Sequence, residues 1–276
     1  MNEQYLFVER IKRSHPFAMS NQMEDSYEMY YLLSGGRRYF VRDQTYTVEP
    51  GTLVLIPPGV IHRTIDAPGV PGHERILVQF SNSYIDHGMH VMPLHLEAFN
   101  MPSPLLPFTG EEKLQIERLL HQLCEEFSAN RSGREPMLQA LMSQLLLSVG
   151  RAMRQNSSRN VLPDSASSPS EERIQPVIDH ILAHCAEPLG LEETAAMFYF
   201  SPAHLSRLFR RSTGFTYSEF VQLVRIRNAQ ELLRTTDRKV LEIAESSGFG
   251  NLSHFQHMFR KHVGMTPLKY RKEVRI

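Results

Sequence analysis

One sequence pattern occurs twice in the C-terminal third of the chain. The stretch SPAHLSRLFRRSTGFT begins at Ser201, and NLSHFQHMFRKHVGMT begins fifty residues later, at Asn251. In each copy a residue of the N-cap type precedes a run with helical spacing, and the run ends at a glycine, Gly214 or Gly264. A shorter helical run precedes each copy. We therefore predict two helix-turn-helix motifs.

A longer run with helical spacing connects the two copies. It covers residues 217–235 (YSEFVQLVRIRNAQELLRT), and a helix of this length extends over roughly 28 Å. Recognition helices that read successive major grooves on one face of DNA lie about 34 Å apart. The spacing predicts that one chain carries two DNA readers, where a simple repressor needs a dimer.

Each predicted recognition helix has an apolar face and a polar face. The residues expected to pack inward are Leu205, Leu208, Phe209, Phe255, Met258 and Phe259. The polar faces and the caps supply the candidate DNA-binding residues, which are Ser201, Ala203, Ser206, Arg207, Arg210, Arg211, Asn251, Ser253, Gln256, His257, Arg260 and Lys261. The alternative for this set is an ordinary solvated basic face.

Side-chain chemistry suggests different roles within the polar faces. Arg207 can bind a guanine edge, Gln256 can pair with adenine, and Ser206 can reach either base. The remaining basic residues suit phosphates, as do the free N–H groups behind the caps.

The charge distribution agrees with an anionic partner for this part of the chain. Residues 173–276 hold 15 Lys and Arg against 10 Asp and Glu, and residues 1–172 hold 15 against 20, although the whole chain is neutral. Phosphate contacts supply most of the non-specific affinity for DNA, so a local basic excess favours a DNA-binding domain. The same excess also fits an ordinary solvated surface.

Composition indicates a globular, soluble, cytosolic protein. Hydrophobic residues make up 41% of the 276 residues, which is enough for two domains. We find no apolar run of about 18 residues and no signal-peptide pattern, and we expect no membrane partner. Cys124 and Cys185 lie far apart in helical patterns and are expected to be buried small hydrophobes.

The middle of the chain contains two predicted helices and a polar segment. Residues 111–128 and 135–153 have helical spacing and are expected to pair as a hairpin within residues 110–154. Their apolar stripe can face an internal core or a second subunit, and we expect a homodimer through this hairpin. Residues 155–172 are rich in Ser, Asn and Pro and predict a flexible linker that separates the flanking domains.

The N-terminal part has the pattern of a small β-barrel or jelly roll. Between Glu28 and about Phe80, short β-rich runs alternate with Gly, Pro and Asp turns. The run from Gly51 to Asp66 resembles the second cupin motif, G(X)5PXGXXH(X)3N, with Asp66 in place of Asn. Residues 28–35 resemble the end of the first motif. The resemblance implies that residues 1–109 form a cupin-like effector-binding domain.

The cupin-like region lacks the usual set of metal ligands. Metal-binding cupins have an HXH pair shortly before the glutamate, and this chain has NQMED at residues 21–25. Glu28 and His62 alone make a poor first-row metal site. We therefore predict no metal, no other cofactor and no catalytic residues. Glu28, Tyr30 and His62 are the candidate effector-binding residues, and the alternative for His62 is a hydrogen-bonded core histidine.

The C-terminal region closely resembles the DNA-binding domain of AraC-type (AraC/XylS) transcription regulators. The resemblance covers about residues 174–270 and includes Ala195 and Ala244, the FR(R/K) runs, the G-x-T endings and GMTPLKYRK at residues 264–272. Many members carry a cupin-like sensor before this module. The first motif has Phe198, Tyr199 and Phe200 where a glycine often shapes the turn.

Together these features predict an α+β multidomain fold. An N-terminal cupin-like β-barrel with a helical hairpin precedes an all-α domain with two helix-turn-helix motifs, at residues 173–276. The resemblance implies a transcription regulator that binds double-stranded DNA and a small-molecule effector, and a sugar or related metabolite is the family-level expectation. The alternatives are a DNA-binding protein without an effector and a cupin enzyme fused to a DNA-binding module.

Overall fold

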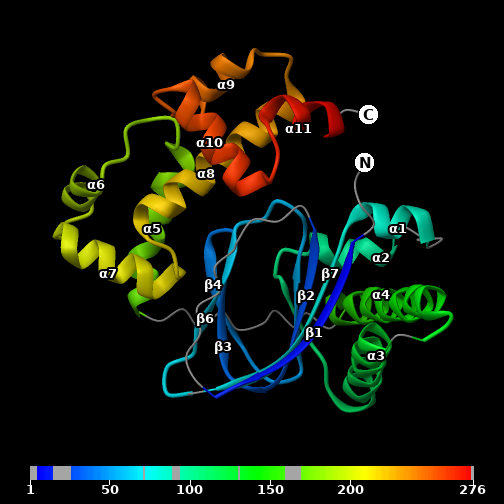
Figure 1. Cartoon of the computed structure of the whole chain (residues 1–276). Coiled ribbons are helices and arrows are strands. Elements are labelled where there is room, and N and C mark those ends of the chain that lie inside the picture. The colour runs from blue at the N-terminus through cyan, green and yellow to red at the C-terminus, as the bar shows by residue number, and fades with distance from the viewer. Residues whose placement is uncertain are drawn as a thin grey trace.

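The structure is a computed structural model that describes residues 5–14, 26–70, 72–88, 94–129, 131–158 and 169–274. A β-rich N-terminal domain with helices on one side is followed by an all-helical C-terminal domain (Figure 1). The predicted α+β multidomain fold is confirmed.

Two antiparallel sheets form the N-terminal domain. The larger sheet contains, in spatial order, β1 (Leu6–Arg13), β7 (His73–Phe80), β2 (Tyr27–Gly35), β5 (Thr52–Ile56) and β8 (Leu105–Pro107). The smaller sheet contains, in spatial order, β4 (Gln44–Val48), β3 (Arg37–Val41) and β6 (His62–Asp66). Strands β1 and β8 lie outside the region in which strands were predicted. Both are edge strands, and β8 is only three residues long, so their sequence signals are weak.

Side chains of the larger sheet alternate between two apolar cores. Tyr30, Leu32 and Val54 face the smaller sheet, whereas Met29 and Tyr31 face a layer of helices. This layer consists of α1 (Asn82–Gly88), α2 (Leu94–Glu97), the short 3-10 helix η1 (Ala98–Asn100), α3 (Gly110–Ser128) and α4 (Arg134–Ser158).

Helices α3 and α4 form the predicted hairpin, and their shared stripe packs internally. Leu141, Leu145 and Leu146 are at most 9% exposed and belong to the core under the larger sheet. Leu114 and Met137 are 62% and 50% exposed. The structure therefore assigns the main stripe to the internal core and leaves only these two large apolar side chains of the hairpin exposed among the described residues.

The predicted linker is helical at both of its ends. Helix α4 continues to Ser158, and α5 (Pro169–Ala183) begins before residue 172. Residues 159–168 lie outside the described residues. Polar composition alone did not reveal that the flanking helices extend into this segment.

The C-terminal domain packs its helices around one aromatic and aliphatic core. After α5 come α6 (Leu191–Met197), α7 (Pro202–Thr213), α8 (Tyr217–Thr235), α9 (Val240–Ser246), α10 (Leu252–Val263) and α11 (Pro267–Val274). Cys124 and Cys185 are unpaired with each other and half-buried. In the described part of the chain, no helix has the length and apolar character needed to cross a membrane.

Candidate functional site

The first helix-turn-helix motif consists of α6 and α7. Helix α7 begins at Ser201, whose Oγ accepts a hydrogen bond from the His204 backbone N–H at 3.3 Å. It ends at Gly214, whose φ of 80° lies in the left-handed region. Leu205 and Phe209 are fully buried. The predicted cap, inward face and stop signal are confirmed.

The second motif, α9 and α10, repeats this construction. Asn251 Oδ1 accepts a hydrogen bond from the His254 backbone N–H at 2.7 Å, and the helix ends at Gly264 with φ 77°. Phe255 and Phe259 are fully buried. Helix α8, which connects the two motifs, has the predicted bounds of 217–235.

The predicted DNA-binding residues lie on the open faces of the two recognition helices. Ser206 is partly exposed, and the others are exposed: Ser201, Ala203, Arg207, Arg210, Arg211, Asn251, Ser253, Gln256, His257, Arg260 and Lys261. Their contacts with DNA remain a prediction.

The predicted effector residues lie between the two sheets of the N-terminal domain. Glu28 is 2% exposed, and its Oε1 accepts a hydrogen bond from the Tyr39 hydroxyl. Its Oε2 accepts a hydrogen bond from Gln79 Nε2 at 2.9 Å and lies 3.6 Å from His62 Nε2. His62 Nδ1 lies 2.8 Å from the Val60 carbonyl oxygen, which can only accept, so this nitrogen carries a proton.

The surroundings of Glu28 favour its ionised form. Burial acts to raise the pKa of Glu28, but the charge of His62 and hydrogen bonds from His62, Tyr39 and Gln79 lower that pKa to about 2. Both carboxylate oxygens already have protein partners. Glu28 therefore organises the neighbouring donors in the barrel.

Tyr30 lies in the same interior, 1% exposed, with its ring centroid 5.2 Å from that of Tyr39. Burial raises the pKa of Tyr30 to about 12, so its hydroxyl stays neutral. The fold thus brings Glu28, Tyr30 and His62 together between the two sheets, and their role in effector binding stays a prediction.

Two buried arginines of this interior were missed by sequence reasoning. Arg37 is 2% exposed and forms an ion pair with Asp66, and Arg75 is 4% exposed and forms an ion pair with Glu9 at 3.0 Å. Asp66 is the residue that departs from the asparagine of the cupin motif. Its carboxylate gives Arg37 a charged partner, which an asparagine would not supply.

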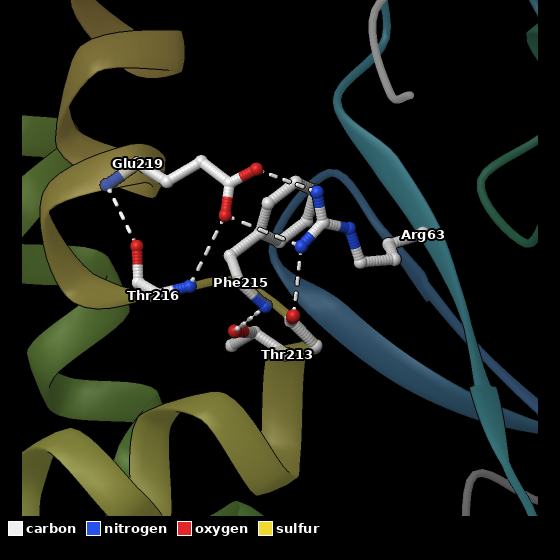
Figure 2. A network of polar contacts seen from close by, with 6 residues as sticks. Arg63, Thr213, Phe215, Thr216 and Glu219 are labelled. Atoms are coloured by element: carbon white, nitrogen blue, oxygen red, sulfur yellow. Dashed lines mark hydrogen bonds and ion pairs between the residues drawn. The ribbon is translucent and has the colours of Figure 1, made fainter. Parts of the chain in front are cut away.

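The outer face of the smaller sheet contacts the first helix-turn-helix motif. Arg63 on β6 donates to Glu219 Oε1 at 2.6 Å and Oε2 at 3.3 Å, and to the Gly214 carbonyl oxygen at 2.8 Å (Figure 2). Its guanidinium carbon lies 3.9 Å from the centroid of the Phe215 ring. Glu219 Oε2 also accepts from the Thr216 backbone N–H, which closes the capping box of α8 (Figure 2).

Further contacts extend this interface over the end of α7. Arg38 donates to the Arg211 carbonyl oxygen at 3.0 Å, and Thr45 donates to the Ser212 carbonyl oxygen at 2.8 Å. These donors satisfy carbonyl groups that a helix C-terminus leaves without intrahelical partners.

Apolar side chains of the sheet complete the interface. Phe40 and Ile61 are fully buried in the core of the C-terminal domain, and the Phe40 ring lies 5.6 to 5.9 Å from the rings of Phe215 and Phe220. A methyl group at Gly214 would approach Arg63 Cδ to 2.7 Å, so the glycine also gives Arg63 room. The two domains are therefore in direct contact, and the flexibility of the segment that joins them stays a prediction.

The alternation of side chains along β3 and β6 indicates this interface in the sequence. Tyr39, His62 and Thr64 lie on the inner face of the smaller sheet. The residues on its outer face are Phe40, Arg63 and Ile65. Neighbouring apolar residues on the outer face of a small sheet, such as Phe40 and Ile65, indicate a covering partner. The pattern itself does not identify that partner.

Metal-binding side chains and a cleft between the domains are the remaining features that concern ligand binding. Among the described residues, no three His, Cys, Asp or Glu side chains are placed to hold a metal ion. Residues 21–25, which stand in place of the missing imidazole pair, lie outside that part. A cleft of about 550 Å³ lies between the loop at Pro58–Val60 and helices α5, α8 and α11, and Arg227 and Gln230 line it.

Known proteins share both halves of this architecture. A sequence profile of AraC-like ligand binding domains matches residues 8–146, and a profile of helix-turn-helix domains matches residues 194–273. The chain is 27% identical over 248 residues to the uncharacterized HTH-type transcriptional regulator YfiF of Bacillus subtilis, covering 89% of this chain and 76% of that protein. It is 25% identical over 243 residues to the HTH-type transcriptional activator RhaS of Enterobacter sp., covering 88% and 78%.

Other known proteins match a smaller part of the chain. The chain is 32% identical over 107 residues to the regulatory protein PocR of Salmonella typhimurium, covering 39% of this chain and 35% of that protein. It is 29% identical to the C-terminal domain of AraT, a response regulator from Geobacillus stearothermophilus, with a TM-score of 0.38, covering 40% of this chain and 91% of that one. The chain belongs to the AraC family of transcription regulators, with an AraC-like ligand-binding domain followed by a helix-turn-helix DNA-binding domain.

Proposed function

We propose that this regulator binds a small molecule in its N-terminal domain and transmits that binding to the first of its two DNA readers. The proposal rests on strands β3 and β6, whose inner faces line the barrel and whose outer faces contact the C-terminal domain. On these strands Tyr39 and His62 point into the barrel toward Glu28, and their sequence neighbours Phe40 and Arg63 contact the C-terminal domain. A ligand that shifts the inner side chains therefore acts one residue away from the interface.

The two recognition helices are proposed to enter successive major grooves. The connecting helix α8 has 19 residues and thus extends over roughly 28 Å, comparable with the separation of two grooves on one face of DNA. Arg207 and Gln256 are the candidates for base recognition, and Arg210, Arg211, Arg260 and Lys261 are the candidates for phosphate contacts.

The barrel interior is the proposed effector site, with Glu28, Tyr30 and His62 as its polar groups. A sugar or related metabolite fits a site that offers neutral hydroxyl and amide groups beside one fixed carboxylate. The cleft lined by Arg227 and Gln230 is a second location, because it is open and touches both domains. The inward-facing polar groups of the barrel argue against a DNA-binding protein without an effector.

We further propose that the protein acts in the cytoplasm as a homodimer, without a catalytic role. The exposed Leu114 and Met137 of the α3–α4 hairpin are the candidates for the subunit contact. The curated relatives named above are transcription regulators, which supports regulation over catalysis.

The proposal is tested by selecting DNA from a random pool with the full-length protein, with and without a panel of sugars. We expect selected sites with two half-sites about one helical turn apart. A sugar of the panel should change the affinity of the wild type and of His121→Ala, a control in the helical layer, but not that of His62→Ala. Selection without any sequence preference, or the same sugar effect in His62→Ala, would contradict the proposal.

A further inference from the structure

Tyr199 combines an unfavourable backbone conformation with an almost fully exposed side chain. It lies in the turn between α6 and α7, two residues before the cap Ser201, and its φ is 59°. In the described part of the chain, only Arg42 and Tyr199 have positive φ among residues other than glycine. The left-handed region is sterically costly for a residue with a side chain.

The second motif has a glycine at the corresponding position. Helix α9 is followed by Ser247 and then Gly248, with φ 84°, just as α6 is followed by Phe198 and then Tyr199. Both turns are closed by the same hydrogen bond, from Phe200 N–H to the Ala195 carbonyl oxygen at 2.8 Å and from Phe249 N–H to the Ala244 carbonyl oxygen at 3.0 Å. The turn therefore requires a left-handed residue, and glycine meets that requirement without strain.

Packing in the folded chain does not explain why a tyrosine occupies this position. The Tyr199 side chain is 96% exposed, and it makes no hydrogen bond or ring contact with any described residue. Its neighbour Phe200, in contrast, stacks on His204 with ring centroids 5.5 Å apart and lies 5.2 Å from the guanidinium carbon of Arg173. A strained, exposed aromatic residue that does nothing for the fold is a candidate for contact with another molecule.

The position of Tyr199 indicates which molecule that is. When a helix-turn-helix motif docks, the N-terminal residues of the recognition helix enter the major groove and the first helix crosses the DNA backbone. The turn between the two helices then lies beside the rim of the groove, where phosphates and sugars are exposed. A tyrosine there offers a hydroxyl donor for a phosphate oxygen and a flat ring for a deoxyribose, and Arg173 adds positive charge nearby.

We propose that Tyr199 contacts the DNA backbone at the edge of the groove that α7 reads. This contact rests on the proposed role of α7 as a DNA reader. Because the hydroxyl is uncharged, its loss should weaken binding to all sequences without changing the salt dependence. The second motif cannot make the same contact, since a side chain at Gly248 would approach the Cys185 carbonyl oxygen to 2.6 Å.

The test compares five variants of the full-length protein for thermal stability and DNA affinity, with Arg207→Ala as the reference for lost DNA reading by α7. Tyr199→Asn and Tyr199→Gly accept the left-handed backbone more readily, so their melting temperature should equal or exceed that of the wild type, while DNA binding weakens about three- to tenfold. Tyr199→Phe keeps the ring and should weaken binding about two- to fivefold at unchanged stability. Met197→Ala, at an exposed neighbouring site, serves as the control and should leave both properties unchanged.

Two outcomes would overturn the proposal. In the first, Tyr199→Asn and Tyr199→Gly bind DNA as tightly as the wild type while Arg207→Ala binds more weakly, which would show that α7 reads DNA without Tyr199. If these two variants also lose transcriptional control, the tyrosine would contact a protein partner instead. Wild-type affinity in Arg207→Ala as well would instead refute the proposed role of α7 itself.

Discussion

The two recognition helices share one construction but differ in their surroundings. The C-terminal end of α7 is covered by the N-terminal domain, which donates hydrogen bonds to the carbonyl oxygens of Arg211, Ser212 and Gly214. Among the described residues, the hydrogen bonds and ring contacts of α10 all lie within the DNA-binding domain. The N-terminal domain therefore contacts the first recognition helix directly, and under the proposed function it acts on the second only indirectly.

The largest expected effect comes from removing the contact between the domains at Phe40. Phe40→Ala removes a fully buried ring from the aromatic cluster of Phe215 and Phe220, which should lower the free energy of unfolding by about 3 kcal/mol. The first motif should then become as independent of the sensor as the second. Differential scanning calorimetry should resolve two transitions where the wild type shows one.

A matched control separates undocking from general instability. Phe99→Ala removes a ring of similar burial from the core beneath the helical layer, away from the interface. It should lower stability to a similar extent while keeping a single transition. Two transitions in both variants would mean that the interface does not couple the domains.

The buried carboxylate of Glu28 on β2 predicts a pH dependence of stability. Because the pKa of Glu28 is lowered to about 2 in the folded chain, its carboxylate stabilises the fold above the ordinary value of 4.5, and this stabilisation is lost as the pH falls toward 2. Urea unfolding should therefore show a steeper loss of stability between pH 4.5 and 2 for the wild type than for Glu28→Gln. Glu111→Gln, at an exposed carboxylate of α3, should follow the wild type, and parallel curves for all three proteins would contradict the internal role of Glu28.

One variant in each recognition helix should distinguish contacts with bases from contacts with the DNA backbone. Arg207→Ala should lose about 1–3 kcal/mol at the selected site and relax the preference at one or two adjacent base pairs. Lys261→Ala should weaken all sequences alike and reduce the salt slope by about one unit. Fluorescence anisotropy at several salt concentrations distinguishes the two, and identical behaviour would mean that neither helix reads bases as proposed.

Sequence reasoning predicted the two motifs because their signals are local. The caps Ser201 and Asn251, the stops at Gly214 and Gly264 and the bounds of α8 all follow from residues within a few turns of helix. The period-two alternation that puts Glu28 and Tyr30 on one face of β2 is equally local. The buried Arg37, which pairs with the partly exposed Asp66, was missed because charged residues are ordinarily expected at the surface.

Contacts between distant segments could not be predicted in the same way. Arg63 and Glu219 are 156 residues apart, and either one alone resembles an ordinary surface charge. The polar composition of residues 155–172 predicted a flexible linker, but it carries no information on the packing of Phe40 and Ile61 into the core of the C-terminal domain.

Hydrogen–deuterium exchange of the full-length Arg63→Ala variant tests most directly whether the sensor acts on the first reader alone. The substitution removes the ion pair with Glu219 and the bond to the Gly214 carbonyl oxygen. We predict faster exchange in peptides that cover residues 209–220 and unchanged exchange in peptides that cover residues 255–263. Unchanged exchange at residues 209–220, or equal acceleration in both regions, would contradict this account of how the sensor reaches the DNA-binding domain.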